Sequence, residues 1–259
     1  MIPESIDVSR MFSRSICGYA NHSGAQQRIA QSLSALLPEP EAVCGPLLEV
    51  GCGTGHLTAF IANRYPTQLK ILSDISRSML SSLTGTPCSK VQCDVTALPF
   101  LPEFSLVVSS SVLHWAQSLE QAFHAIAQIL STRGSLVCAV MIHGTCHELH
   151  SVRSLVVPSK KPRRKLPTET ECRSACQAAG FQIQQSSLLS LTENYPSAES
   201  AVRSLHEAGL TGGALSRGDL PIMRGELHEI YKEYERQFMV SAAVPVSFCA
   251  VLIRACKIV

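Results

Sequence analysis

The sequence predicts an α/β protein with a doubly wound, mostly parallel β-sheet and an antiparallel last strand. Two observations support this fold. Apolar runs of strand length alternate with helical patterns through the first half of the chain, which is typical of parallel strands joined by crossover helices. The first such strand, 47–51, turns into a helix through Gly51, Gly53 and Gly55. A chain of 259 residues, 46% of them apolar, can also bury a large core.

The N-terminal half of the chain supplies helices and then the predicted sheet. Residues 5–37 have helical periodicity, interrupted at 19–23, and end in Leu37-Pro-Glu-Pro40. The expected strands are 47–51, 69–74, 89–93, 104–110 and 134–142, and the connecting helices are 55–65, 76–83 and 117–130. Ser76 is a suitable N-cap for the second of these helices, because its hydroxyl can accept from a free backbone N–H. Residues 131–134 predict a tight turn into the fifth strand.

The second half of the chain is less regular. Residues 143–167 lack a clear period, and a helix at 168–179 is expected to end at the C-cap Gly180. A strand at 181–191, a helical insertion at about 196–240 with a Gly-rich break at 209–213, and a last strand at 244–255 follow. We expect one domain, 1–259, with its core at about 41–192 and 241–259. The N-terminal helices, 5–40, and the insertion, 193–240, are expected to form a cap over the substrate.

Composition excludes several classes of protein. No apolar stretch approaches the ~18 residues of a transmembrane helix, and the N-terminus lacks the basic start and apolar stretch of a signal peptide. Eleven cysteines scattered through apparent strands and helices favour a reducing compartment, here the cytoplasm. The formal charge of +2 says little about partners, but the lack of a wider basic face or of interleaved aromatic residues argues against nucleic acid.

Two groups of residues raise the question of a metal. Cys172 and Cys176 are one helical turn apart, and a second group contains His143, Cys146, His147 and His150. Neither group has the paired C-x-x-C spacing of a structural zinc site. We therefore expect no metal, with the two cysteines on the inner face of a helix and the histidines on a loop and helix start.

The glycine-rich turn and the acidic residues near it predict a ligand site. The spacing G-x-G-x-G leaves the backbone open to a ligand, because glycine has no side chain to block it. Glu49 precedes the first glycine, and Asp74 ends the second strand roughly 20 residues later. An acid at that strand end can hold ribose hydroxyls. The alternative for Asp74 is a helix N-cap, and a glycine-rich turn alone also occurs in many other α/β proteins.

Four features resemble the motifs of class I S-adenosylmethionine-dependent methyltransferases, which have a Rossmann-like sheet. They are the glycine-rich turn with Glu49, the acid Asp74, the strand end Val91–Asp94 and the polar tip of strand 104–110. The resemblance implies that Asp94 accepts from the adenine amine and that the next residue lies near the ring. Asp94 as a plain turn residue stays open. The implied cofactor is S-adenosylmethionine, bound by Glu49, Gly51, Gly53, Gly55, Asp74, Asp94, Val95 and Ser110.

Further segments resemble the malonyl-acyl-carrier-protein O-methyltransferases over nearly the whole chain. They are Phe12-Ser-Arg14 with Tyr19 and Gln26, Gly144–Leu149, Arg164-Lys-Leu-Pro167, and Ala201–Leu205 with Gly209. His206 replaces the usual Lys, Gly212-Gly213 replaces a small residue and an aromatic or His, and His114 replaces the usual Gln. The resemblance implies esterification of the malonyl carboxylate at the start of biotin synthesis, on malonyl-acyl carrier protein or malonyl-coenzyme A. It also implies a monomeric cytoplasmic enzyme with no nucleic-acid or membrane partner.

Four residues are candidates for handling the acceptor. Arg203 suits a carboxylate, because a guanidinium binds it in bidentate fashion, although it can instead be a surface arginine paired with Glu199 or Glu207. Tyr19 is expected to close the pocket and donate to the substrate or cofactor carboxylate, or else simply to pack. His114 is expected to orient the substrate, or to bond to backbone. Trp115 is expected to form a wall of the pocket.

The basic segment 160–165 has two interpretations: a docking surface for an acidic carrier protein, or an ordinary solvated loop. Two other functions also stay open. One is a related methyltransferase for another small molecule, such as a carboxylate of the trans-aconitate type. The other is a non-catalytic module that binds S-adenosylmethionine.

Overall fold

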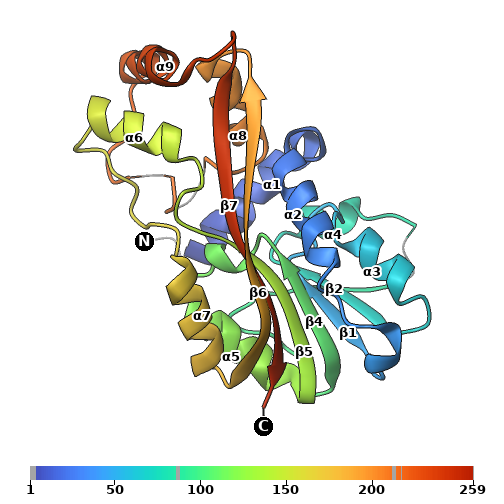
Figure 1. Cartoon of the computed structure of the whole chain (residues 1–259). Helices are drawn as coiled ribbons and strands as arrows, with labels where there is room; N and C mark the ends of the chain where they lie inside the picture. The colour runs from blue at the N-terminus through green and yellow to red at the C-terminus, as the bar shows by residue number, and fades with distance from the viewer. Residues whose placement is uncertain (1–3, 86–87, 212–213, 217, 259) are drawn as a thin grey trace.

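A seven-stranded sheet forms the centre of the protein, with the strand order β3-β2-β1-β4-β5-β7-β6 (Figure 1). The structure is a computed structural model that describes residues 4–85, 88–211, 214–216 and 218–258. The strands are β1 Leu47–Val50, β2 Lys70–Asp74, β3 Ser89–Gln92, β4 Phe104–Ser110, β5 Leu130–Met141, β6 Phe181–Tyr195 and β7 Val244–Lys257. The pairs from β3 through β5 are parallel, and β7 is antiparallel to both β5 and β6. The predicted doubly wound sheet with an antiparallel last strand is confirmed.

Helices cover both faces of the sheet. They are α1 Glu4–His22, α2 Gly24–Ser34, α3 Thr58–Arg64, α4 Arg77–Ser82, α5 Leu119–Ile129, α6 His147–Val156, α7 Glu169–Ala178, α8 Ala198–Glu207 and α9 Arg224–Phe238. Ile29 of α2 and Ile61 of α3 share one core with Leu47 of β1. Phe123 of α5 and Cys176 of α7 share the core on the other face. All four residues of β1 are buried, as expected for a central parallel strand, so three of them are apolar and the fourth, Glu49, is a buried acid.

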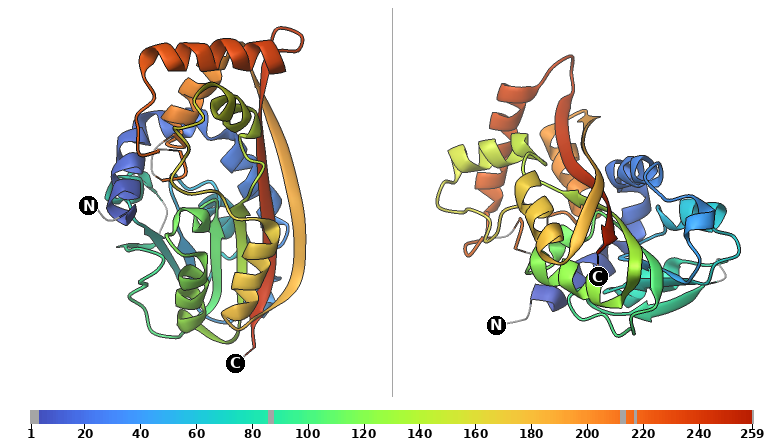
Figure 2. Two further views of the ribbon diagram at one scale, coloured as in Figure 1. Left: turned by 90° about the vertical axis from the view of Figure 1, so that its left-hand side faces the viewer. Right: turned by 60° about the horizontal axis from the view of Figure 1, so that its bottom comes forward.

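Beyond the main sheet, β6 and β7 continue as a long two-stranded ribbon that carries a helical layer. The two strands stay paired from Phe181 and Lys257 to Tyr195 and Val244. Figure 2 shows α9 lying across the far end of this ribbon, with α6 and α8 beside it. The Tyr234 hydroxyl of α9 donates to the carbonyl of Pro245 (2.7 Å), which ties the helix to β7. The predicted insertion therefore forms a layer at one end of the sheet.

Several local predictions are confirmed. The N-terminal helices break at Ser23, between α1 and α2. The Ser76 side chain accepts from the N–H of Met79 and caps α4. Gly180 adopts a φ of +87° just after α7, as a C-cap requires.

Other local predictions were wrong or incomplete. Residues 143–167 contain α6, whose apolar side chains are too few for a clear helical period. β5 begins at Leu130, four residues early, because Arg133 adopts a φ of +64° and a bulge keeps the chain in the sheet. β6 runs to Tyr195, since pairing with β7 holds its exposed polar residues in a strand. Of the Gly-rich break, Gly212 and Gly213 lie outside the described residues.

Within the part of the chain that the structure describes, no helix has both the length and the apolar character needed to cross a bilayer.

Candidate functional site

A cavity of about 930 Å³ opens at the carboxyl ends of β1, β2 and β4. This is the edge of a doubly wound sheet where ligands bind, because the connections on either side of β1 run to opposite faces. The lining comes from α1, α2, the turn after β1, the ends of β2 to β4, and the segment between α6 and α7. The predicted site residues that line it are Tyr19, Glu49, Gly51, Gly53, Asp74, Asp94, Val95, Ser110 and Trp115.

The three glycines of the turn all adopt positive φ angles: +70° at Gly51, +52° at Gly53 and +93° at Gly55. A side chain on Gly51 would overlap Val112, and one on Gly55 would overlap Leu83. Around Gly53 a Cβ would meet no heavy atom within 4 Å, and this residue lines the cavity. Gly51 and Gly55 are therefore required by packing as well as by φ, while Gly53 leaves its backbone open toward the cavity.

Asp74 joins the glycine turn to the end of β2. Its Oδ2 accepts from the N–H of Gly53 (2.9 Å), and its Oδ1 accepts from the N–H of Ser76 (2.8 Å). The side chain lies at the cavity and is 8% exposed. Burial raises the pKa of Asp74, and hydrogen bonds from the backbone of Ser76, Gly53 and Ile75 partly oppose this. Each carboxylate oxygen has a second lone pair, so Asp74 can still accept from a ligand.

Glu49 lies beneath the same turn and is 2% exposed. Its Oε2 accepts from the Thr58 hydroxyl (2.7 Å). Burial, together with the negative charge of Asp74, raises the pKa of Glu49 to about 8 against the opposing effect of the Thr58 hydrogen bond. This raised pKa favours the protonated carboxyl group in the free protein, and a cation placed in the cavity favours the ionised form.

The third strand end supplies an acid and an apolar contact. Asp94 Oδ1 accepts from both the N–H (2.9 Å) and the hydroxyl (2.8 Å) of Thr96, which fixes the carboxylate at the cavity. Val95 follows it and is 8% exposed. The turn role that the sequence left open is therefore present, and the second oxygen of Asp94 has no hydrogen-bond partner among the described residues.

Four buried polar atoms at the cavity lack a hydrogen-bond partner among the described residues. They are Gln26 Oε1, Thr54 Oγ1, Ser110 Oγ and Ser111 Oγ. Buried polar groups are normally satisfied, so their convergence on one cavity fits a ligand with several polar groups, as a nucleoside bearing an amino acid has. Among the predicted site residues only Ser110 belongs to this set. Thr54, between two of the glycines, and Ser111, with a φ of +59°, were missed.

Aromatic side chains wall the other end of the cavity. The ring of Tyr19 stacks on His56 with centroids 6.1 Å apart, and Phe12 meets Trp115 edge-on at 5.5 Å. Ser23, at the break between α1 and α2, hydrogen-bonds His56 Nε2 through its hydroxyl (2.7 Å). Burial and the nearby Asp74 raise the pKa of Tyr19, which remains a phenol and a hydrogen-bond donor.

The structure does not bring three of the predicted residues to the cavity lining, namely Gly55, which shapes the turn, His114 and Arg203. His114, in the short 3₁₀ helix η2 (Leu113–Trp115), is 3% exposed but lies behind the wall, tilted against Trp115. Burial and the charge of Arg164 lower the pKa of His114 to about 3. Arg203 lies outside the cavity, with its side chain 67% exposed and paired with Glu199 (2.7 Å) one helical turn away. This is the surface arrangement that the sequence allowed as the alternative.

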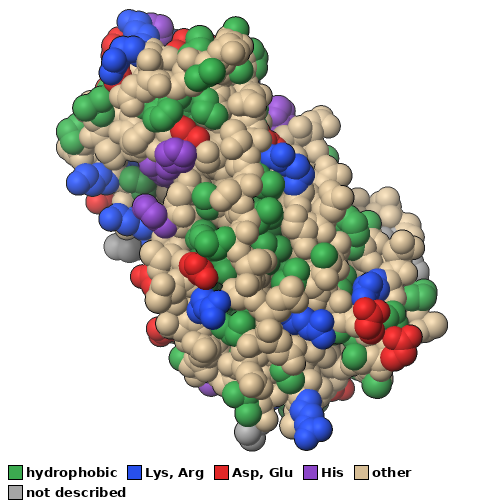
Figure 3. Space-filling model, viewed as in Figure 1, with side chains coloured by type: hydrophobic (Ala, Val, Ile, Leu, Met, Phe, Trp, Pro, Cys, Tyr) green, Lys and Arg blue, Asp and Glu red, His purple; other side chains and the backbone are tan. Residues whose placement is uncertain are grey.

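Two arginines of the basic segment reach the cavity instead. Arg164 donates to the carbonyls of Trp115 and Ala116 and so fixes the wall. Arg163 lies at the rim and pairs with Asp219 (2.9 Å). Figure 3 shows Lys and Arg side chains at the left-hand edge of the molecule, where the segment between α6 and α7 runs.

Over residues 4–258, apart from the gaps at 86–87, 212–213 and 217, no three His, Cys, Asp or Glu side chains are arranged to hold a metal ion. Cys172 and Cys176 are fully buried on the inner face of α7, as expected.

Residues 48–138 match the family model described as "Methyltransferase domain". A malonyl-[acyl-carrier protein] O-methyltransferase of Herminiimonas arsenicoxydans is 33% identical over 178 residues, which are 68% of this chain and 66% of that protein. The protein of that name from Anoxybacillus flavithermus is 23% identical over 258 residues, covering 93% and 96% of the two chains.

Two solved structures share the fold at low identity. An S-adenosylmethionine-dependent methyltransferase of Thermotoga maritima superposes with a TM-score of 0.57 at 17% identity, over 96% of this chain and 99% of that one. One of Mesorhizobium loti gives a TM-score of 0.50 at 19% identity, over 91% and 100%.

Proposed function

This chain belongs to the class I S-adenosylmethionine-dependent methyltransferases, and we propose that it methylates the free carboxylate of a malonyl thioester carried by acyl carrier protein. The product is a malonyl methyl ester, the starting compound of biotin synthesis. Curated relatives with this activity in their names align over most of the chain, which supports the proposal. The observation that carries it is a single cavity that joins cofactor-binding residues to two arginines at its acceptor end.

The cavity residues fit S-adenosylmethionine, which supplies a methyl group on a positively charged sulfur when bound. We assign the ribose to Asp74, the adenine to Asp94 and Val95, and the amino-acid part to the glycine turn above Glu49. Thr54, Ser110, Ser111 and Gln26 add polar atoms that lack partners among the described residues. The ribose, the adenine and the amino-acid part of S-adenosylmethionine are thus each assigned a matching contact in the cavity lining.

The acceptor needs no base from the protein. A carboxyl group with a pKa near ~4 is already ionised at neutral pH and is a nucleophile as it stands. Burial lowers the pKa of His56, whose Nε2 is hydrogen-bonded to Ser23, and His114 lies behind the wall. A cavity of this kind suits an acceptor that arrives ionised better than a hydroxyl that must first lose a proton.

The work left to the protein is positioning and exclusion of water. Trp115 and Phe12 form an apolar wall, and Tyr19 can donate from its phenol to a carboxylate. In-line alignment of a nucleophile and a methyl group can contribute on the order of 7–11 kcal/mol. We infer that α1 and the 214–216 segment, whose Leu215 packs with Val8 and Trp115, form the cap over the acceptor.

The proposed partner is a malonyl carrier protein, and the proposed compartment is the cytoplasm. All eleven cysteines are free thiols, which suits a reducing environment. Lys161 and Lys165 are exposed beside the cavity rim and are the part of the basic segment available to an acidic carrier.

The deciding experiment measures transfer of a radiolabelled methyl group from S-adenosylmethionine to malonyl-acyl carrier protein. Acetyl-acyl carrier protein, which lacks the free carboxylate, and trans-aconitate run beside it. Label on the malonyl carrier alone is the expected result. Label on trans-aconitate instead, or on none of the three by protein that binds the cofactor, would reject the proposed substrate.

A further inference from the structure

We propose that Arg163 receives an anionic group of the methyl acceptor at the cavity rim, and that Asp219 occupies this guanidinium until the acceptor displaces it. The identity of the acceptor rests on the proposed function. The exchange itself rests on the placement of these two residues, and it assigns to Arg163 the role for which Arg203 was a candidate.

Arg163 combines two properties that no other cation of the segment 160–165 has together. It lines the cavity, and its only ion-pair partner among the described residues is an exposed carboxylate. Nε lies 2.9 Å from Asp219 Oδ1, and the two side chains are 58% and 88% exposed. Lys160 pairs with Glu226 away from the cavity lining, and Arg164 is committed to the carbonyls behind Trp115.

An exposed ion pair of this kind is easily exchanged. Water and salt screen it, and such pairs change an equilibrium constant by no more than about fivefold. A carboxylate or phosphate held at the cavity rim is less solvated and can take both nitrogens of the guanidinium. The incoming anion therefore competes on favourable terms with Asp219.

The exchange needs no opening of the surrounding structure. The backbone N–H of Arg164 donates to Ala214 O (3.0 Å), and Lys160 Nζ donates to Pro221 O (2.8 Å). The guanidinium of Arg153 also donates to Ser216 O. These bonds hold Ala214, Ser216 and Pro221 in place without the Arg163–Asp219 pair, so substitutions of that pair should leave the fold intact.

Malonyl thioesters offer Arg163 two anions, the terminal carboxylate and the phosphate of the pantetheine arm. Malonyl-coenzyme A carries both, whereas malonyl-N-acetylcysteamine carries the carboxylate alone. The two thioesters therefore distinguish the sources of the anion.

The test compares Arg163→Gln and Asp219→Asn with the wild type. Arg173→Gln and Glu169→Gln, which remove an exposed ion pair of α7 outside the cavity, are the matched controls. KM is measured for both thioesters, with the affinity for S-adenosylmethionine measured separately.

Arg163→Gln should raise KM at least about tenfold, since it removes a charge-assisted hydrogen bond. Asp219→Asn should lower KM about two- to fivefold, because it removes the competitor. In the control variants KM should stay within about twofold of the wild-type value. The affinity for S-adenosylmethionine should stay within about twofold in all the variants.

If Arg163→Gln raises KM for both thioesters, Arg163 binds the carboxylate. If it raises KM for the coenzyme A thioester alone, Arg163 binds the phosphate. The exchange is overturned if Arg163→Gln leaves KM unchanged, or if Asp219→Asn raises it. If the wild type methylates neither these thioesters nor malonyl-acyl carrier protein, the proposed function fails by itself. Titration of the three proteins with malonate and with inorganic phosphate then decides the exchange, which requires weaker binding in Arg163→Gln and tighter binding in Asp219→Asn.

Discussion

At the scale of single residues, the site depends on carboxyl groups whose surroundings set their charge. Asp74 is held by the N–H groups of Gly53 and Ser76, while the Thr58 hydroxyl is the one side-chain donor to Glu49 within the described part of the chain. These two carboxyl groups of the cavity thus differ in the hydrogen bonds that favour their ionised forms. Glu49 is the one whose proton should respond to the positive charge of the cofactor.

We predict that affinity for S-adenosylmethionine rises from pH 6 to about pH 8 and then levels off. The pKa of Glu49 is raised to about 8, so binding of a cation below that pH must release its proton. Calorimetry in buffers of different ionisation enthalpy should detect this release at pH 7. Thr58→Val, which removes the hydrogen bond that favours the ionised form, should move the levelling point upward.

The matched variant Glu49→Gln should bind with little dependence on pH. If the affinity of this variant depends on pH as strongly as that of the wild type, another group titrates.

The raised pKa of Glu49 also implies that the free energy of unfolding of the free protein falls between about pH 4.5 and pH 8, because Glu49 loses its proton at a lower pH in the unfolded chain.

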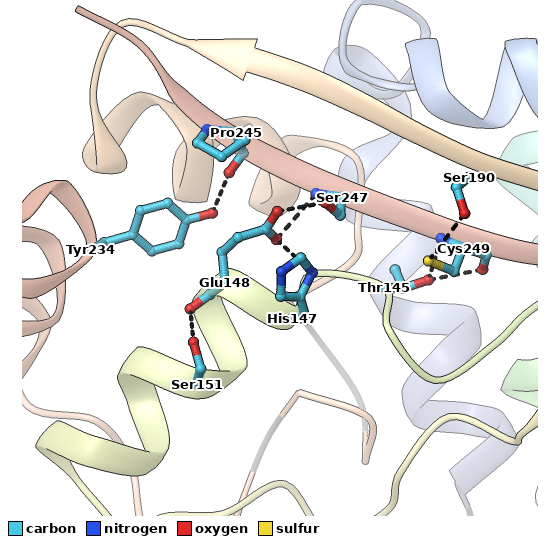
Figure 4. A network of polar contacts seen from close by, with 9 residues as sticks. All are labelled: Thr145, His147, Glu148, Ser151, Ser190, Tyr234, Pro245, Ser247 and Cys249. Carbon is cyan, nitrogen blue, oxygen red and sulfur yellow. Dashed lines mark hydrogen bonds and ion pairs between the residues drawn. The ribbon is translucent and has the colours of Figure 1, made fainter. Parts of the chain in front are cut away.

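At the scale of elements, α6 is fixed to β7 by one buried carboxylate (Figure 4). Glu148 is 2% exposed and accepts from the N–H (3.1 Å) and the hydroxyl (2.5 Å) of Ser247. The N–H of Cys146 returns a bond to Ser247 O (2.6 Å). This contact joins α6, and with it the helical layer around α9, to β7. It also fixes the helix from which the segment between α6 and α7 continues.

We predict that Glu148→Ala lowers the free energy of unfolding by about 2–4 kcal/mol, since it removes a buried carboxylate and leaves two partly buried donors of Ser247 without an acceptor. Urea denaturation measures the change. Ser151→Ala, which removes an exposed hydroxyl bonded to the Glu148 carbonyl, is the local control and should cost less than about 0.5 kcal/mol. Similar losses in both variants would contradict a bracing role for the carboxylate.

At the scale of the whole molecule, the basic segment 160–165 joins the helical layer to the cavity rim. Lys160, Arg163 and Arg164 all have partners within the chain, while Lys161 and Lys165 have none in the described part and are exposed. Two of the five cations of the segment are therefore left to form the proposed docking surface. Its exposed charges stand close to the rim at which an acyl chain would enter.

We predict that Lys161→Glu with Lys165→Glu lowers kcat/KM about tenfold or more for malonyl-acyl carrier protein at low ionic strength. The effect should be less than about twofold for malonyl-N-acetylcysteamine, because reversed charges slow the encounter with an acidic protein most. Lys232→Glu with Arg236→Glu on α9 changes the net charge by the same amount and is the control. Equal losses with both substrates would exclude docking at this surface, and added salt should narrow the difference between wild type and variant.

The sequence by itself determined the sheet, the glycine turn and the acids at the ends of β1 to β3. These features are local: apolar runs, positive φ angles and residues at strand ends are fixed by nearby chain positions. The acceptor end was decided by tertiary structure. Arg203 and Arg163 look alike in the sequence, but α8 turns one toward solvent, while contacts of residues 160–164 with Ala214 and Pro221 bring the other to the rim. Long-range packing, which no local pattern encodes, selects between them.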